Sequence, residues 1–107
     1  MLTRKDAIKI IRDFIAACAD RNITFSKVIL FGSVAENRAH QYSDIDVALV
    51  SDKFSGSPFK DWSMLSPVKI SKRDFIDIEP HPFTAKYFKK GDPFIDEIKK
   101  TGIEIKE

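Results

Sequence analysis

The sequence predicts an α/β (α+β) fold, in which helices pack on a small mixed β-sheet. Three observations predict it: a helical pattern of apolar residues over 3–20, two short β-rich apolar runs at 27–31 and 44–51, and two more helical patterns near the C-terminus. Helical and strand patterns that alternate in this way are typical of a sheet covered by helices. A length of 107 residues suits one core, so we expect a single domain over 1–107.

Composition and charge exclude several classes of protein. An apolar fraction of 43% and nine phenylalanines favour a packed globule over a disordered segment. The net charge of +2 is too small for a chain that binds nucleic acid by charge alone. The N-terminus is charged too early for a signal peptide, and no apolar run reaches transmembrane length, so we expect a cytoplasmic protein without membrane contact. We expect the single cysteine, Cys18, in the core.

The N-terminal region begins with a helix and a strand. Thr3 and Asp6 form the pattern of a capping box, and the apolar stripe that follows continues to about Asp20. The run KVILF at 27–31 is a short apolar stretch of strand character. A helix followed by a strand is therefore predicted.

Two further elements follow the first strand. Ser33 is a good N-cap and Glu36 lies three residues later, which predicts a short helix over 34–40. Residues 44–51 are almost continuously apolar after their two aspartates. Such a run is expected for a strand that is covered on both faces.

The middle of the chain predicts a loop and a strand. Residues 52–67 are rich in Ser, Pro and Gly, which predicts a loop around a helical turn at 62–65. Residues 74–79 alternate acidic and apolar side chains, the pattern of a strand with one polar face. Prolines on both sides of His81 should stop this strand, so we expect His81 to be a turn residue.

The C-terminal region predicts two helices and an edge strand. Residues 84–89 and 93–101 have helical patterns, and Asp92 can cap the second of them, with a proline at its first position. Gly102 should end that helix, and 103–105 would form the edge strand.

A glycine follows the first strand directly. Gly32 would let a ligand approach the backbone at a place where a Cβ atom would collide. If a helix follows, its free N–H groups suit a phosphate, and Ser33 adds a hydroxyl. A plain turn is the alternative interpretation.

Two aspartates open the second strand. Asp44 and Asp46 would point to the same face, with Cα atoms about 6.6 Å apart. Two ionised carboxylates at that spacing repel each other unless a cation lies between them, and their hard oxygen ligands suit Mg²⁺ or Mn²⁺. The alternative is a pair of strand-end residues that face water.

A second acidic pair strengthens the metal hypothesis. Asp77 and Glu79 share a strand face in the same way, and a neighbouring strand could bring one of them beside the first pair. Three carboxylates with a Gly-Ser loop point to two-metal phosphoryl chemistry, in which ions about 3.5–4 Å apart activate an attacking oxygen and stabilise the leaving group.

The stretch GSVAENRAHQYSDID resembles the signature of nucleotidyltransferases in the DNA polymerase beta superfamily. That signature is Gly-Ser, ten residues, then Asp-x-Asp, and the segment from Gly32 to Asp46 fits it without a gap. The short chain is similar to the minimal nucleotidyltransferases of bacteria and archaea. The resemblance implies a nucleotidyltransferase-like fold.

The resemblance also implies roles for the signature residues. Asp44 and Asp46 would be catalytic and would bind two Mg²⁺ ions, while Gly32, Ser33 and Ser43 would bind the nucleoside triphosphate, with ATP as the expected substrate. A later carboxylate would complete the metal site or act as general base.

The third carboxylate is either Asp77 or Glu79. Asp77 fits the family's apolar–acidic–apolar pattern. Glu79 is slightly favoured, because its strand end adjoins a loop as that of Asp44 does. We therefore place Glu79 with the metal ligands and keep Asp77 as the alternative.

One departure from the family concerns charge. Basic residues often follow Gly-Ser in the family, whereas this chain has Val34 and Glu36 there. Glu36 would repel a triphosphate unless it points away, and Arg38 is the available substitute.

The resemblance further implies a partner. Similar minimal nucleotidyltransferases pair with HEPN-type toxins and silence them, in known cases by adenylylation. We expect the acceptor to be a hydroxyl of such a partner, rather than a nucleic acid such as tRNA or a small molecule. The docking surface would border Asp44 and 52–67, where Phe59 and Trp62 supply aromatic contacts. The rival hypothesis is a regulatory module of the same fold that acts by binding alone.

Overall fold

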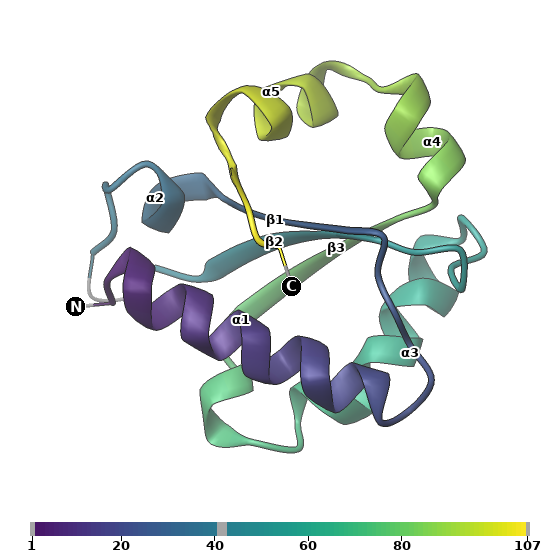
Figure 1. The fold of residues 1–107 in the computed structure, drawn as a ribbon, viewed down its shortest axis with the longest axis horizontal. Coiled ribbons are helices and arrows are strands. Elements are labelled where there is room, and N and C mark those ends of the chain that lie inside the picture. Colours follow the sequence, from purple (N-terminus) through teal and green to yellow (C-terminus); the bar gives the residue numbers. More distant parts are fainter. Residues whose placement is uncertain (1, 41–42, 107) are drawn as a thin grey trace.

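The fold is a four-stranded mixed sheet with helices on both faces (Figure 1). The computed structural model describes residues 2–40 and 43–106. The sheet order is β3-β2-β1-β4, with β1 antiparallel to β2 and β4, and β2 parallel to β3. The elements are α1 (Arg4–Ala19), β1 (Lys27–Phe31), α2 (Gly32–Ala35), β2 (Ile45–Val50), α3 (Pro58–Lys69), η1 (Arg73–Phe75), β3 (Ile78–Phe83), α4 (Ala85–Lys90), α5 (Pro93–Thr101) and β4 (Ile103–Glu104). The predicted fold class is confirmed.

One face of the sheet is covered by α1 and α3, which lie on the same side in Figure 1. Helix α1 begins with the predicted capping box: the Asp6 N–H donates to Thr3 Oγ1 at 3.1 Å, and the Thr3 N–H donates to the Asp6 carboxylate at 3.4 Å. Its apolar stripe, which includes Cys18, is buried against the sheet. This larger core carries most of the apolar burial.

The other face is covered by α4 and α5 (Figure 1). Its smaller core consists of Ile29, Phe31, Ala48, Val50, Phe88, Ile95 and Ile98. Helix α5 has the predicted cap, because Asp92 Oδ1 accepts the Ile95 N–H at 2.7 Å. No helix in 2–40 or 43–106 is long and apolar enough to cross a membrane.

The expectation of a loop over 52–67 with a turn at 62–65 is wrong. Helix α3 occupies most of that segment and continues beyond it, to Lys69. Leu65 and Val68 are buried in the larger core, and this burial stabilises a helix that contains an internal proline. Tertiary packing here overrides the composition of the segment.

The start of α3 is fixed by a buried aspartate. Asp61, 2% exposed, accepts the N–H of Ser55 at 2.7 Å and the N–H of Gly56 at 2.9 Å. Ser57 is the N-cap residue and Pro58 occupies the first turn, where its missing N–H is not needed. The Ser57-Pro58 pair is the signal in the sequence that could have placed this helix start.

The third strand lies later than predicted. The expected strand over 74–79 is a 3₁₀ turn at Arg73–Phe75, and β3 runs through Pro80 and Pro82 instead of stopping there. The C=O of Asp77 accepts the N–H of Ile45 at 2.8 Å. In this pairing, the backbone N–H and C=O groups of the odd-numbered residues of β3 point toward β2.

The backbone nitrogens of the two prolines, which carry no hydrogen, therefore face the open edge of the sheet. Pro80 and Pro82 pair with Val47 and Leu49 in register, but their backbone nitrogens face away from β2. No hydrogen bond of the β2–β3 ladder is lost. The same prolines protect the exposed edge from pairing with another strand.

Candidate functional site

The register of the sheet places the candidate carboxylates in rows. Asp46 on β2 pairs with Phe31 on one side and with Glu79 on the other. Paired residues point to the same face, so the side chains of Asp46 and Glu79 share the face that α4 and α5 cover in part. Asp44 and Asp77 immediately precede the two strands, and both are exposed. The neighbour of Asp46 across the strands is thus Glu79, not Asp77.

Gly32 makes room for the Asp46 carboxylate. It has a φ of +78°, and a Cβ atom built on it would lie 2.4 Å from Asp46 Oδ2. We predicted that this glycine lets a ligand approach the backbone, and the structure adds that the Asp46 carboxylate itself needs the space beside it. A side chain at position 32 would displace the central carboxylate of the site.

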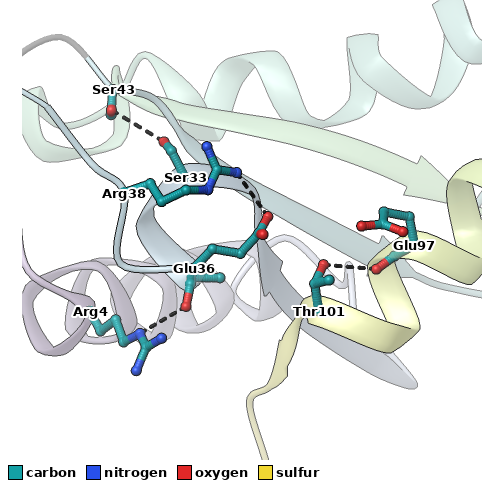
Figure 2. A network of polar contacts seen from close by, with 8 residues as sticks. Arg4, Ser33, Glu36, Arg38, Ser43, Glu97 and Thr101 are labelled. Atoms are coloured by element: carbon teal, nitrogen blue, oxygen red, sulfur yellow. Dashed lines mark hydrogen bonds and ion pairs between the residues drawn. The ribbon is translucent and has the colours of Figure 1, made fainter.

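The ends of the ten-residue linker of the signature are tied together. The Ser33 hydroxyl bonds to the Ser43 hydroxyl at 3.2 Å (Figure 2), and the His40 N–H donates to the same Ser43 oxygen at 2.9 Å. The Arg38 N–H donates to the Ser33 C=O at 2.7 Å. These bonds hold both signature serines at one end of β1 and β2, where Gly32 and Asp46 also lie.

The short helix differs from the prediction of 34–40 with Ser33 as N-cap. Helix α2 begins at Gly32, and its N-cap residue, Phe31, makes no side-chain bond. The Ser33 hydroxyl is engaged with Ser43 and the Glu36 carboxylate with an arginine, so neither is used for a capping box.

The acidic departure from the family is compensated within the chain. Glu36 Oε2 lies 3.0 Å from Arg38 Nη2, and the Nε of Arg4 donates to the Ala35 C=O at 2.8 Å (Figure 2). Arg38 thereby neutralises Glu36. An ion pair this exposed is weak, so the Arg38 guanidinium remains accessible to a competing anion.

His81 is a site residue that sequence reasoning missed. We predicted a turn residue, but His81 lies inside β3 with its Nε2 at 3.3 Å from Asp46 Oδ1. Each of the two side chains is 28% exposed. The signal was present: Asp77, Glu79 and His81 continue a period of two through the prolines, on the face that carries Asp46.

The donor atoms are of the type that a hard divalent cation prefers. Asp46 and Glu79 offer carboxylate oxygens from adjacent strands, and Asp44 lies two residues before Asp46. Within the described part of the chain, no three His, Cys, Asp or Glu side chains are gathered closely enough to hold an ion. The register thus supplies one adjacent pair, with Asp44 and Asp77 exposed beside it.

Comparisons with known proteins identify the family and the fold. The family model "Polymerase beta, Nucleotidyltransferase" matches residues 14–107. A crystal structure at 1.40 Å of a "putative nucleotidyltransferase from Sulfolobus solfataricus" superposes with a TM-score of 0.66 at 18% identity, over 94% of this chain and 80% of that one. A search of curated proteins finds no match. The structural likeness supports the fold, and the family match covers most of the chain, so this protein belongs to the polymerase beta nucleotidyltransferase family.

Proposed function

We propose that the protein transfers a nucleoside monophosphate, AMP from ATP, to a hydroxyl group of a partner protein. The observation that carries this proposal is the placement of Asp46 against Gly32, with Glu79 opposite it on the next strand. Carboxylate oxygens at this point are the donors that two-metal transfer chemistry would use, and the family match supports that chemistry.

One set of residues would bind the metal ions and another the nucleotide. Asp44, Asp46 and Glu79 would hold two Mg²⁺ ions, which supply charge neutralisation for the triphosphate and activate the acceptor oxygen. Ser33 and Ser43 would donate hydroxyl hydrogen bonds to phosphate oxygens.

The transfer itself exchanges one bond for another. The acceptor oxygen forms a bond to the α-phosphorus, and the bond from that phosphorus to the departing pyrophosphate breaks. The acceptor proton passes to a nearby carboxylate. We choose Glu79 for this role too, because it is exposed and lies beside Asp46, and because a carboxylate that binds an ion through one oxygen can accept a proton on the other.

The acceptor proposal rests on exposure. Asp44 and Glu79 face solvent, and pockets for small molecules normally bury most of their ligand. A second protein would supply the missing wall, and a HEPN-type toxin is the partner we propose. On α3, Phe59 is 80% exposed and Trp62 46% exposed. Helix α3 lies across the sheet from α5 in Figure 1. A partner that contacted both the Glu79 face and α3 would therefore wrap around the β3 edge.

A regulatory module without catalysis is the second candidate. Two observations favour it: the His81 ring contacts Asp46 where a metal would bind, and Glu36 holds Arg38 at the position where the family is often basic. Such a module would neutralise its partner by binding alone.

One experiment separates the two candidates. The protein is incubated with its co-purified partner, Mg²⁺ and ATP labelled at the α-phosphate, and the partner's mass is measured. A gain of one AMP unit that requires intact Asp46 supports the transferase. A partner that stays bound with an unchanged mass supports the regulatory module, and labelling of a free small molecule would contradict the partner proposal.

A further inference from the structure

A cluster of aromatic rings borders the Asp46 carboxylate. The Phe31 ring centroid lies 5.0 Å from that of His81 and 5.6 Å from that of Phe94, and the His81 and Phe94 centroids are 5.8 Å apart. His81 also contacts Asp46, at 3.3 Å. The carboxylate, the imidazole and the Phe94 ring therefore follow one another along the same sheet face.

The sheet register explains how the histidine reaches the carboxylate. His81 pairs with Ala48, and Asp46 lies two residues earlier on the same face of β2. Because Ala48 carries only a methyl group, the His81 ring has space to lean across it toward Asp46 and Phe31. The ring is then held between the carboxylate and the aromatic side chains.

Phe94 stands on a firmly anchored helix start. Asp92 caps α5 through the Ile95 N–H at 2.7 Å and accepts the Tyr87 hydroxyl at 2.5 Å. The Tyr87 hydrogen bond lowers the pKa of Asp92, which keeps the capping carboxylate charged. Ile95 is fully buried, whereas its neighbour Phe94 remains 47% exposed. A half-exposed ring on a fixed backbone presents a rigid apolar surface.

We propose that Phe94, with His81 beside it, is the platform on which the base of the bound nucleotide stacks. This inference rests on the proposed function. With phosphates at Gly32 and Asp46, the ribose would lie over His81 and the base would reach Phe94. Bases stack on aromatic side chains with little sequence preference, so we expect weak discrimination between ATP and GTP.

Another exposed aromatic side chain, Phe59, provides a control. Phe59 is more exposed than Phe94, at 80% against 47%, but it lies on α3, across the sheet from α5. Exposure alone therefore does not mark the platform. Proximity to Asp46 through His81 distinguishes Phe94.

Calorimetric titration with Mg²⁺-ATP and with Mg²⁺-tripolyphosphate tests the platform, because tripolyphosphate keeps the charge and lacks the base. F94A should weaken ATP binding about five- to 150-fold and leave tripolyphosphate binding unchanged. F94L keeps apolar bulk in case the alanine variant unfolds and should act in the same direction. F94Y should bind as the unmodified protein does, and so should F59A.

The remaining outcomes overturn the platform in different ways. Unchanged ATP affinity in F94A and F94L contradicts it, and so does an equal loss for ATP and tripolyphosphate, which would indicate displaced phosphate ligands. If the unmodified protein binds tripolyphosphate as tightly as ATP, the base contributes nothing, while the phosphate site of the proposed function survives. If it binds neither compound, the proposed function fails together with the platform.

Discussion

The two faces of β2 differ in what they bury. Toward α1 and α3 the strand presents Ile45, Val47 and Leu49, none of them more than 1% exposed. Toward α4 and α5 it presents Ala48 and Val50, but begins with Asp46, whose side chain is 28% exposed. One six-residue strand therefore carries the core on one face and the candidate chemistry on the other. The face of a residue on this strand should decide whether its substitution harms folding or activity.

The largest effect should come from Asp46→Asn. Loss of groups that only support metal ligands already costs roughly 10- to 100-fold, so loss of a ligand itself should reduce Mg²⁺-dependent transfer more than about 100-fold. Stability should be unchanged or slightly higher, because the carboxylate that repels Glu79 is removed. Transfer assays and denaturant unfolding measure the two quantities. Loss of folding would show that Asp46 is structural.

Leu49→Ala tests the opposite face of the same strand. Leu49 is fully buried in the larger core, so its truncation should lower the free energy of unfolding by about 2–5 kcal/mol. Activity per folded molecule should stay near that of the unmodified protein at a temperature where both are folded. A loss of activity as large as that of the Asp46 variant would break the division between the two faces.

Glu79→Gln and Asp77→Asn sharpen the assignment on the chemical face. Glu79 lies opposite Asp46 in register, while Asp77 precedes the strand. We expect about 100-fold or more lower transfer for Glu79→Gln, which removes a proposed metal ligand, and at most a few-fold change for Asp77→Asn. Steady-state kinetics on both variants decides. The reverse order would move the third carboxylate to Asp77.

The smallest effect concerns Cys18, inside the larger core. Burial raises the pKa of the Cys18 thiol to about 12, so the native protein should react with a thiol reagent at pH 8 only as it unfolds. The pKa of Cys18 in the folded protein exceeds the ordinary value of 9.0. The stability that the buried neutral thiol contributes is therefore fully present below pH 9 and falls as the pH rises toward 12. Labelling rates with and without denaturant test it, and rapid labelling of the native protein would contradict the burial.

Elements with local signals were predictable from the sequence. The capping box of Thr3 and Asp6 and the Asp92 cap are formed by residues three apart, so the helix starts of α1 and α5 could be placed correctly. The course of β3 was left open by the sequence, because its period of two continues through Pro80 whereas a proline often ends a strand. Whether Pro80 interrupts a strand depends on whether its nitrogen faces the neighbour or the open edge, and only the sheet order decides that.

The candidate site was likewise predictable only where its residues lie close together in the sequence. The spacing of Gly32 and Asp46 marked the site, because it lies within one short stretch of chain. The contact of His81 with Asp46 was missed, since it follows from the unexpected length of β3. The position of Glu79 beside Asp46 likewise required the parallel register of two strands.

We propose that the Asp46 face of the sheet is a metal-dependent nucleotide site. Its most direct test is calorimetric titration of ATP into the unmodified protein and into Asp46→Asn, each in Mg²⁺ and in EDTA. We expect ATP binding only for the unmodified protein in Mg²⁺, with no measurable binding under the other three conditions. ATP binding of equal strength in EDTA, or unchanged binding by Asp46→Asn, would contradict it and place the nucleotide elsewhere on the molecule.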